Sequence, residues 1–548
     1  MDELSCREKI MSNDYYDLIV DFSFQADQFG SDYCNIRLPY RAYISYVNRK
    51  ILPELSIAEY SYAIIPKLYG LLSCDALLAS GILNVQQSFL KLTGRGIMVG
   101  FIDTGIDYRK EAFRFPDGST RIAAIWDQTI QTGDPPKDLP YGTEYLRAQI
   151  NQALFSENPF EIVPSRDEFG HGTAMAQVAA GSFPEGSEYC GAAPECVIAA
   201  VKCKDAKPYL KEFYAVNEDV FAISEADLLT AVQYLNALAE RNNMPLVICM
   251  GVGTNLGDHN GRSSLAQFMD IIALNNLRTI VVAGGNEGNA RHHVEGGGEY
   301  SEVEIHVAER ENGFFMELWG SAPDVFSISL RSPGGEIVER IQPRLGESSE
   351  FRFLYDRTVV TVDYRIVERE TGGELIAVRF RNPSPGIWVI GVYGSPTNQG
   401  NYHMWLPLTG FISEDTYFLR SSPDVTLTEP SNAFAPITVS GYNEITGGIY
   451  ADGSRGFTRS GSVKPDLSAP AVGIRTDVGT YTGTSMAAAM TAGAAADFLE
   501  WAAILGNAPN INSEDVKNYF KKGAVREIGV SYPNQQEGDD GIIVHSIC

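Results

Sequence analysis

One serine stands between a Gly-Thr pair and a run of alanines in the stretch YTGTSMAAAMTAGAAA, residues 481–496. This pattern predicts a helix of small residues that begins at Thr484 or Ser485. A hydroxyl at a helix N-terminus can act as a nucleophile, because the helix dipole favours negative charge that develops there. The same residues would also serve as an ordinary helix cap. The choice therefore depends on whether the chain supplies a base and an acid that orients it.

Among the seven histidines, His171 has the surroundings that a catalytic base needs. It lies in DEFGHGTAMAQVAAG between two glycines and before a predicted small-residue helix, so a substrate could approach it closely. Asp103 in GFIDTGID follows a buried strand and could fix the imidazole tautomer and stabilise its cation. Asp107 is a second candidate for that acid, although it lies farther from the strand end. A helix-start histidine and a strand-end aspartate also occur in sites without catalysis.

Asn286 is a candidate donor to an oxyanion. It follows a predicted strand and the glycines Gly284 and Gly285 in VVAGGNEGN. Its side-chain amide and the backbone N–H of Ser485 could together bind a tetrahedral oxyanion, although a turn asparagine is the simpler alternative. The order Asp, His, Asn, Ser, each with suitable neighbours, is more specific than any one of the four. Together they indicate acyl transfer to a serine.

Apolar strands alternate with helical patterns in two parts of the chain, before and after a segment of another kind at residues 298–430. The alternation predicts an α/β domain with a mostly parallel sheet, whose ligands bind at the carboxyl ends of strands. Between its two parts, short alternating runs broken by Gly, Pro and Asn predict an inserted antiparallel β-sandwich that braces the α/β domain. The expected organisation is an N-terminal α+β unit (1–67), the first part of the α/β domain (68–297), the sandwich (298–430), and the second part with a C-terminal tail (431–548).

Composition excludes several classes of function for this 548-residue chain. A net charge of −26 argues against a nucleic-acid partner and an anionic membrane surface. Membrane insertion is not expected, because no run of about 18 apolar residues occurs. The acidic N-terminus lacks a secretory signal pattern, so we expect synthesis in the cytoplasm. The eight cysteines form no CxxC pair, and the setting of Cys196 and Cys203 favours reduced, buried thiols.

These motifs resemble those of the subtilisin-like serine proteases. The matching stretches are FIDTGID, HGTAMAQVAAG, GGNEGN, VKPDLSAPAV and GTSMAAAMTAG. The resemblance implies a three-layer subtilisin-like fold and a serine endopeptidase that works through an acyl-enzyme. Asp103 would orient His171, which would act as base and then as acid, while Ser485 attacks and Asn286 holds the oxyanion.

The resemblance also implies a substrate-binding strand. Gly251, Val252 and Gly253 match the segment that pairs with an extended peptide, and their small size would admit its backbone. Gly284 and Gly285 are further candidates for substrate binding. The sequence departs from the family pattern at this strand, where Ser-Leu-Gly is usual. It also departs at Ala174, where histidine is frequent, and at Ala489, where proline is usual, but no catalytic group is lost.

More narrowly, the chain resembles the Csp-type germination proteases of clostridial spores, through LTGRGIMVGFIDTGIDY, RIAAIWDQTIQTG, YGTEYLRAQIN and the inserted β module. That resemblance implies an N-terminal prodomain, an inserted jelly roll, activation of a cortex-lytic enzyme precursor, and incorporation into the spore. The prodomain would act as an intramolecular chaperone and inhibitor. We expect self-cleavage near Tyr62–Lys67. Some members of that group have lost triad residues and act as regulators, whereas this chain retains all of them.

Two other functions remain open at this point. One is a germination-signalling pseudoprotease whose intact triad is blocked by a retained prodomain, and the other is a carbohydrate-binding structural protein built around the β module. The expected partners of the protease are a protein or peptide substrate and its own N-terminal unit. No cofactor is expected to be required. Structural calcium is expected, but its ligands cannot be assigned because the acids from Asp107 to Asp167 are too many to choose among. The pair His292–His293 is not expected to bind metal.

Overall fold

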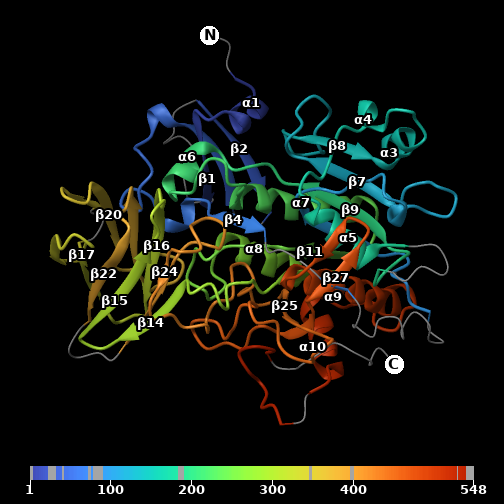
Figure 1. Ribbon diagram of the computed structural model, residues 1–548. Helices are drawn as coiled ribbons and strands as arrows, with labels where there is room; N and C mark the ends of the chain where they lie inside the picture. The colour runs from blue at the N-terminus through green and yellow to red at the C-terminus, as the bar shows by residue number, and fades with distance from the viewer. Residues whose placement is uncertain are drawn as a thin grey trace.

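The computed structural model describes residues 4–21, 32–39, 42–71, 76–77, 91–182, 191–344, 348–394, 400–526 and 529–538. A sheet with helices on both faces forms the centre of the molecule (Figure 1). Within the described ranges this sheet has eight strands in the order β26-β25-β13-β11-β6-β9-β7-β8. Neighbouring strands are parallel except for β7 and β8 at one edge. The predicted α/β domain with a mostly parallel sheet is confirmed.

The strands of this sheet are short and almost entirely buried. They are β6 (Met98–Asp103), β7 (Ile122–Asp127), β8 (Thr143–Leu146), β9 (Val197–Lys202), β11 (Leu246–Met250), β13 (Arg278–Ala283), β25 (Ile437–Tyr442) and β26 (Leu467–Pro470). The longer helices are α5 (His171–Ala180), α7 (Glu225–Arg241), α8 (Ser264–Ala273), α9 (Thr484–Leu499) and α10 (Ser513–Gly523), and the shorter ones are α1 (Cys6–Met11), α3 (Arg147–Leu154), α4 (Pro159–Ile162) and α6 (Pro208–Phe213).

Alternation of side chains along the strands builds two hydrophobic cores, one on each face of the sheet. On β6, Val99 and Phe101 pack in the core that contains α5 and α9. Met98 and Ile102 pack in the core that contains α7 and α8. Successive side chains of a strand point to opposite faces, so the apolar runs read from the sequence require helices on both sides.

The alanines of α9 allow this helix to pack very closely against its neighbours. Every residue from Thr484 to Leu499 is buried. A Cβ atom added at Gly493 would lie 2.3 Å from the Cβ of Ala192 and 2.6 Å from the carbonyl oxygen of Ala179 in α5. Larger side chains would therefore push the two helices apart, and the run of small residues serves packing as well as any chemistry at its start.

The N-terminal unit packs on the α7–α8 face of the sheet. Its three antiparallel strands, in the order β1 (Tyr15–Asp21), β3 (Ala42–Asn48) and β2 (Tyr33–Leu38), share one hydrophobic core with α7. A buried ion pair adds to this contact, since Lys207 Nζ lies 2.6 Å from Asp17 Oδ1. The unit is drawn in blue near the N label in Figure 1.

The structure confirms the prediction made for two of the cysteines. Cys196 and Cys203 are free and buried, and so is Cys249. The structure joins Cys6 and Cys34, for which the sequence analysis made no prediction, in a disulfide between α1 and β2. The remaining cysteines, Cys74, Cys190 and Cys548, lie outside the described residues.

Two small sheets connect the first residues of the chain to the α/β domain. In one, β4 (Leu68–Leu71) lies between β10 (Ile223–Ser224) and β12 (Val252–Gly253) and is antiparallel to both. In the other, β5 (Ala76–Leu77) is parallel to β27 (Gly473–Thr476), which forms an antiparallel hairpin with β28 (Gly479–Tyr481). Both sheets bear on the functional site described below.

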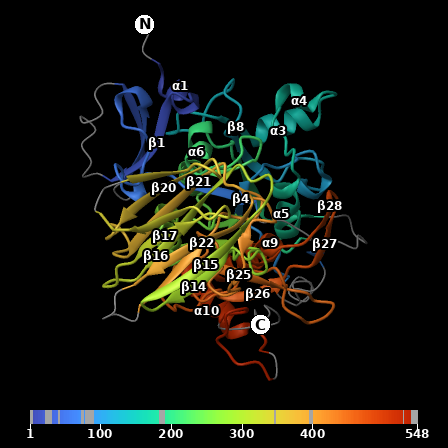
Figure 2. The same cartoon turned by 60° about the vertical axis from the view of Figure 1, so that its left-hand side comes forward.

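The inserted module is an antiparallel sandwich with its own core. It stands at the left in Figure 1 and comes forward in Figure 2. Its larger sheet has the order β14-β23-β16-β21-β20-β19 and its smaller sheet the order β18-β17-β22-β15-β24. The strands are β14 (His293–Gly297), β15 (Tyr300–Val307), β16 (Gly313–Gly320), β17 (Ser327–Arg331), β18 (Ile337–Ile341), β19 (Ser348–Phe353), β20 (Thr358–Arg365), β21 (Glu374–Arg381), β22 (Gly386–Tyr393), β23 (Asn401–Trp405) and β24 (Tyr417–Phe418).

The sandwich begins and ends at one place on the α/β domain. Its first strand starts at His293, before the expected boundary at residue 298. The backbone N–H of Phe418 donates to the carbonyl of Arg291 at 3.0 Å, and that of Ser422 donates to the carbonyl of His293 at 2.9 Å. The incoming and outgoing segments are thus hydrogen-bonded to each other.

Direct contacts also join the sandwich to the α/β domain. The ring of His259 stacks on Trp405 with centroids 4.0 Å apart. The side-chain amide of Asn255 donates to the carbonyl of Leu406 at 3.2 Å. These contacts support a bracing role for the module. In the described part of the chain, the search for helices with the length and hydropathy of a membrane span found none.

Candidate active site

Asp103 and His171 meet where strand β6 ends and helix α5 begins. The Nδ1 atom of His171 lies 2.7 Å from Oδ1 of Asp103, and the two residues are 2% and 1% exposed. The backbone N–H of Thr104 donates to the same carboxylate oxygen at 2.8 Å. The carboxylate of the other candidate, Asp107, contacts the guanidinium of Arg109 at 2.9 Å instead. The structure therefore brings Asp103, rather than Asp107, to the histidine.

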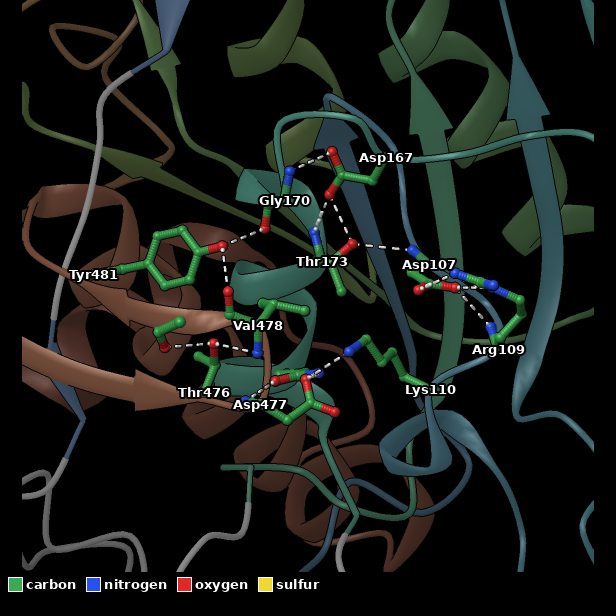
Figure 3. A network of polar contacts seen from close by, with 12 residues as sticks. Asp107, Arg109, Lys110, Asp167, Gly170, Thr173, Thr476, Asp477, Val478 and Tyr481 are labelled. Atoms are coloured by element: carbon green, nitrogen blue, oxygen red, sulfur yellow. Dashed lines mark hydrogen bonds and ion pairs between the residues drawn. The ribbon is translucent and has the colours of Figure 1, made fainter.

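A second carboxylate, Asp167, holds the loop that leads into His171. Its Oδ1 accepts from the backbone N–H of Gly170 at 2.9 Å and from the Thr104 hydroxyl at 2.7 Å. Its Oδ2 accepts from the backbone N–H of Thr173 at 2.8 Å and from that residue's hydroxyl at 2.6 Å (Figure 3). The sequence analysis counted Asp167 only among candidate calcium ligands. The available signal was an aspartate four residues before a helix-start histidine, with a threonine two residues after it.

Two glycines allow the backbone to come unusually close to the pair. A Cβ atom on Gly172 would lie 3.2 Å from Oδ1 of Asp103. A Cβ atom on Gly251 would lie 2.4 Å from the sulfur of Met175 and 3.1 Å from Cε1 of His171. The substitution of glycine for the serine usual at position 251 therefore has a steric basis, since His171 and Met175 occupy the space that a side chain would need.

Ser485 is the second residue of α9 and is fully buried. Its backbone N–H lies in the first turn of the helix, where such groups lack partners within the helix. Its hydroxyl makes no hydrogen bond to any described residue. The structure thus pairs Asp103 with His171 but shows no hydrogen bond from that pair to the serine.

Asn286 follows strand β13 and contacts the start of the same helix. Its Oδ1 accepts from the backbone N–H and the hydroxyl of Thr484, each at 3.1 Å. Since the amide oxygen faces Thr484, the amide nitrogen is directed to the other side of the carboxamide. The glycines before it have partners within the protein: Gly284 donates to the carbonyl of Val439 at 2.9 Å, and Gly285 to the Thr484 hydroxyl at 3.1 Å.

The strand expected to bind substrate carries a segment of the chain itself. Val252 faces Leu71, and Gly253 faces Gly70, in the antiparallel pair of β12 with β4. The other edge of β4 pairs with β10. β4 therefore lies beside β12 as an extended peptide does when it is bound by β-addition, hydrogen-bonded through its backbone as a strand of a sheet.

The expected cleavage stretch Tyr62–Lys67 lies before this strand, and buried side-chain contacts hold both of its ends. The Tyr62 hydroxyl donates to Glu317 of the sandwich at 2.5 Å, and Lys67 Nζ lies 3.4 Å from the carboxylate of Glu225. All four side chains are buried. Burial raises the pKa of Glu317 to about 7, although hydrogen bonds from Tyr62 and from the backbone of Gly257 oppose that rise. Among the described residues, the N-terminal segment pairs with β12 at Gly70 and Leu71, after these anchoring contacts.

No metal site was found among the described residues. In those ranges, no group of three or more His, Cys, Asp or Glu side chains could hold an ion. The adjacent histidines point to different partners, since His292 Nδ1 lies 2.8 Å from Glu287 and His293 Nε2 lies 3.0 Å from Nδ1 of His403. Structural calcium therefore stays a prediction without assigned ligands.

Comparison with known proteins covers both parts of the α/β domain. The profile of the subtilase family matches residues 94–312 and 399–539. The structure of the CspB protease of Clostridium perfringens superposes with a TM-score of 0.76 at 31% identity, covering 84% of this chain and 94% of that one.

Two curated plant proteins match shorter regions. The subtilisin-like protease SBT3.6 of Arabidopsis thaliana is 26% identical over 204 residues, which is 36% of this chain and 26% of the relative. The subtilisin-like protease SBT2.2 of the same plant is 30% identical over 107 residues, which is 18% of this chain and 12% of the relative. The matched part of this chain thus spans about a quarter or less of the length of either plant relative.

Proposed function

This chain belongs to the subtilase family of serine endopeptidases, and we propose that it hydrolyses peptide bonds with Asp103, His171 and Ser485 through an acyl-enzyme. The observation that carries the proposal is the buried contact of 2.7 Å between His171 Nδ1 and Asp103 Oδ1. A carboxylate in that position holds the imidazole in the tautomer whose Nε2 can accept a proton.

The proposed reaction assigns one task to each group. Ser485 Oγ attacks the scissile carbonyl carbon and gives its proton to Nε2 of His171, while Asp103 stabilises the imidazolium. The oxyanion accepts hydrogen bonds from the Asn286 amide and the Ser485 backbone N–H. His171 then protonates the leaving amine, and water repeats the sequence to release the acid. On this proposal the hydrogen bond from the Ser485 hydroxyl to Nε2 of His171 forms when substrate binds, because catalytic hydrogen bonds tighten in the substrate complex.

We further propose that the first substrate is the chain's own N-terminal segment. The pairing of Leu71 with Val252 supports this, because β12 follows directly on Gly251, where an added Cβ atom would lie 3.1 Å from Cε1 of His171. At the next described residues, Ala76 and Leu77, the chain pairs with β27, which lies shortly before the start of α9. The cut would therefore fall between Leu71 and Ala76.

The likeness to the CspB protease supports a narrower proposal about the physiological substrate. On this proposal the enzyme activates the precursor of a cortex-lytic enzyme during spore germination, as the resemblance to the Csp-type proteases implies. The same β4 pairing also favours one competing function. If the N-terminal segment stayed bound without being cut, it would block the site, and the protein would act as a signalling pseudoprotease.

Intact-mass measurement of the purified chain beside Ser485→Ala separates these functions. The protease proposal requires the parent to divide into two pieces whose masses place the cut between Leu71 and Ala76, while Ser485→Ala stays whole. A parent that stays whole but binds a fluorophosphonate at Ser485 would be an active enzyme with a permanent N-terminal unit. A parent that neither divides nor binds the probe would support the blocked, signalling function.

A further inference from the structure

The hairpin of β27 and β28 leads directly into the nucleophile helix. Its strands pair antiparallel, with Ile474 facing Tyr481. The other edge of β27 carries β5 of the N-terminal segment as a parallel strand, with Gly473 facing Ala76 and Ile474 facing Leu77. β27 is therefore the central strand of this three-stranded sheet, and one of its two neighbours is a piece of the proposed self-substrate.

This hairpin is fixed to the helix that begins with His171. The Tyr481 hydroxyl donates to the carbonyl of Gly170 at 3.2 Å. At the turn, the backbone N–H of Asp477 donates to Gln177 of α5 at 3.0 Å, and the Asp477 carboxylate lies 3.5 Å from Lys110 Nζ (Figure 3). A peptide held on β27 is thereby held at a fixed position relative to α5.

The N-terminal segment pairs first with β12, through β4, and then with β27, through β5. Gly70 and Leu71 pair with β12, and a Cβ atom added at Gly251, just before that strand, would lie 3.1 Å from Cε1 of His171. Ala76 and Leu77 lie on β27, in the hairpin that runs into Ser485. Residues on β12 therefore precede the proposed scissile bond, and residues on β27 follow it.

We propose that β27 is a docking strand for the residues that follow the scissile bond, in the chain's own segment and then in protein substrates. The inference rests on the proposed function and adds a second recognition surface to it. After the cut, Ala76 and Leu77 belong to the new N-terminal segment, and their departure would leave the N–H and C=O groups of this edge of β27 unpaired. Such an edge binds an extended peptide through its backbone, with little demand on its side chains.

The test in cis uses the timed self-cleavage of the full chain, followed by intact mass. Ala76→Pro and Leu77→Pro each remove one backbone N–H from β5, whereas the matched controls Ala76→Ser and Leu77→Val keep it. In a β-ladder only alternate residues present their N–H to a given neighbour. One proline variant should therefore slow self-cleavage about 3- to 10-fold, the effect of one lost hydrogen bond, and by more than the other proline variant.

Three outcomes would overturn the inference. Both proline variants could cleave at the parental rate, or Ala76→Ser and Leu77→Val could slow cleavage as much as the prolines do. Either result would leave β27 without a role in holding the segment. A parent that never divides, like Ser485→Ala, would instead overturn the proposed function, and this inference with it.

The extension to substrates in trans is tested with two internally quenched peptides. One copies residues 66–75 and the other residues 66–80, both with serine in place of Cys74. The self-processed chain should cleave the longer peptide with a kcat/KM several-fold higher, because only that peptide reaches β27. Equal kcat/KM values, or cleavage of neither peptide by a chain that has processed itself, would limit the docking strand to the chain's own segment.

Discussion

Gly172 offers a sharp test of the geometry around Asp103 and His171, the proposed catalytic pair. A Cβ atom at this position would lie 2.3 Å from the carbonyl oxygen of Gly105, 3.1 Å from Cβ of Asp103 and 3.2 Å from Oδ1 of Asp103. The contact with the Gly105 oxygen would need about 1 Å more room to be unstrained. Gly172→Ala must therefore move the start of α5 or the end of β6. A misplacement of about 1 Å costs about 100-fold in rate, or ~2.7 kcal/mol in activation free energy.

Self-cleavage of Gly172→Ala should therefore be about 100-fold slower than that of the parent, as followed by timed intact masses. Helix propensity alone predicts the opposite trend in stability, since alanine in a helix is favoured over glycine by about 1 kcal/mol. Gly448→Ala is a matched control, because its added Cβ atom would meet Thr446 Oγ1 at an ordinary 3.5 Å. If Gly172→Ala cleaved itself at the parental rate, with an unchanged Tm, the steric argument would be refuted.

Three further predictions concern other parts of the structure. Asn286→Ala should slow self-cleavage about 10²- to 10³-fold, as the loss of one oxyanion donor does in subtilisin. Self-cleavage at the parental rate would mean that Asn286 only holds the start of α9. Burial raises the folded-state pKa of Glu317 from 4.5 to about 7, so the stability from its bound proton is complete below pH 4.5 and is lost as the pH rises through 7. The Tm of Glu317→Gln relative to the parent should therefore rise across that interval, and a constant difference would contradict the assignment. Lys67→Met leaves Glu225 buried without its cation and should weaken retention of the N-terminal unit by about 3–5 kcal/mol, which size-exclusion chromatography of the cleaved protein can detect. Adding Glu225→Met should restore part of the retention, and no recovery would argue against the ion pair as the cause.

The elements that carry Asp103 and His171 could be placed from the sequence because their signals are local. Asp103 ends an apolar strand, and His171 opens a helix between two glycines, so each motif contains the element that positions it. The choice between Asp103 and Asp107 needed the structure, because both follow the same strand and only coordinates show that Asp107 faces Arg109.

The pairing of the N-terminal segment could not be predicted from local patterns. Leu71 faces Val252, and Ala76 faces Gly473, across separations of about 180 and 400 residues. The apolar pattern of a strand does not specify which distant strand it pairs with. The stretch expected for cleavage was therefore chosen without knowledge of this pairing, and its position stays a prediction. The disulfide of Cys6 with Cys34 was missed in the same way, since spacing alone does not determine which cysteines meet.

The hydrogen bonds that join the first and last segments of the sandwich have a consequence for how the central sheet assembles. Strands β13 and β25 are neighbours in that sheet, yet about 150 residues separate them along the chain, and closing so long a loop is slow and entropically costly. Once the sandwich has folded on its own core, the hydrogen bonds from Phe418 to Arg291 and from Ser422 to His293 reduce the effective loop to about 30 residues. The entropic cost of joining β13 to β25 then falls by about 1.5 kcal/mol. The sandwich would thus act as a staple during folding, bringing β13, the strand before Asn286, to the half of the chain that carries Ser485.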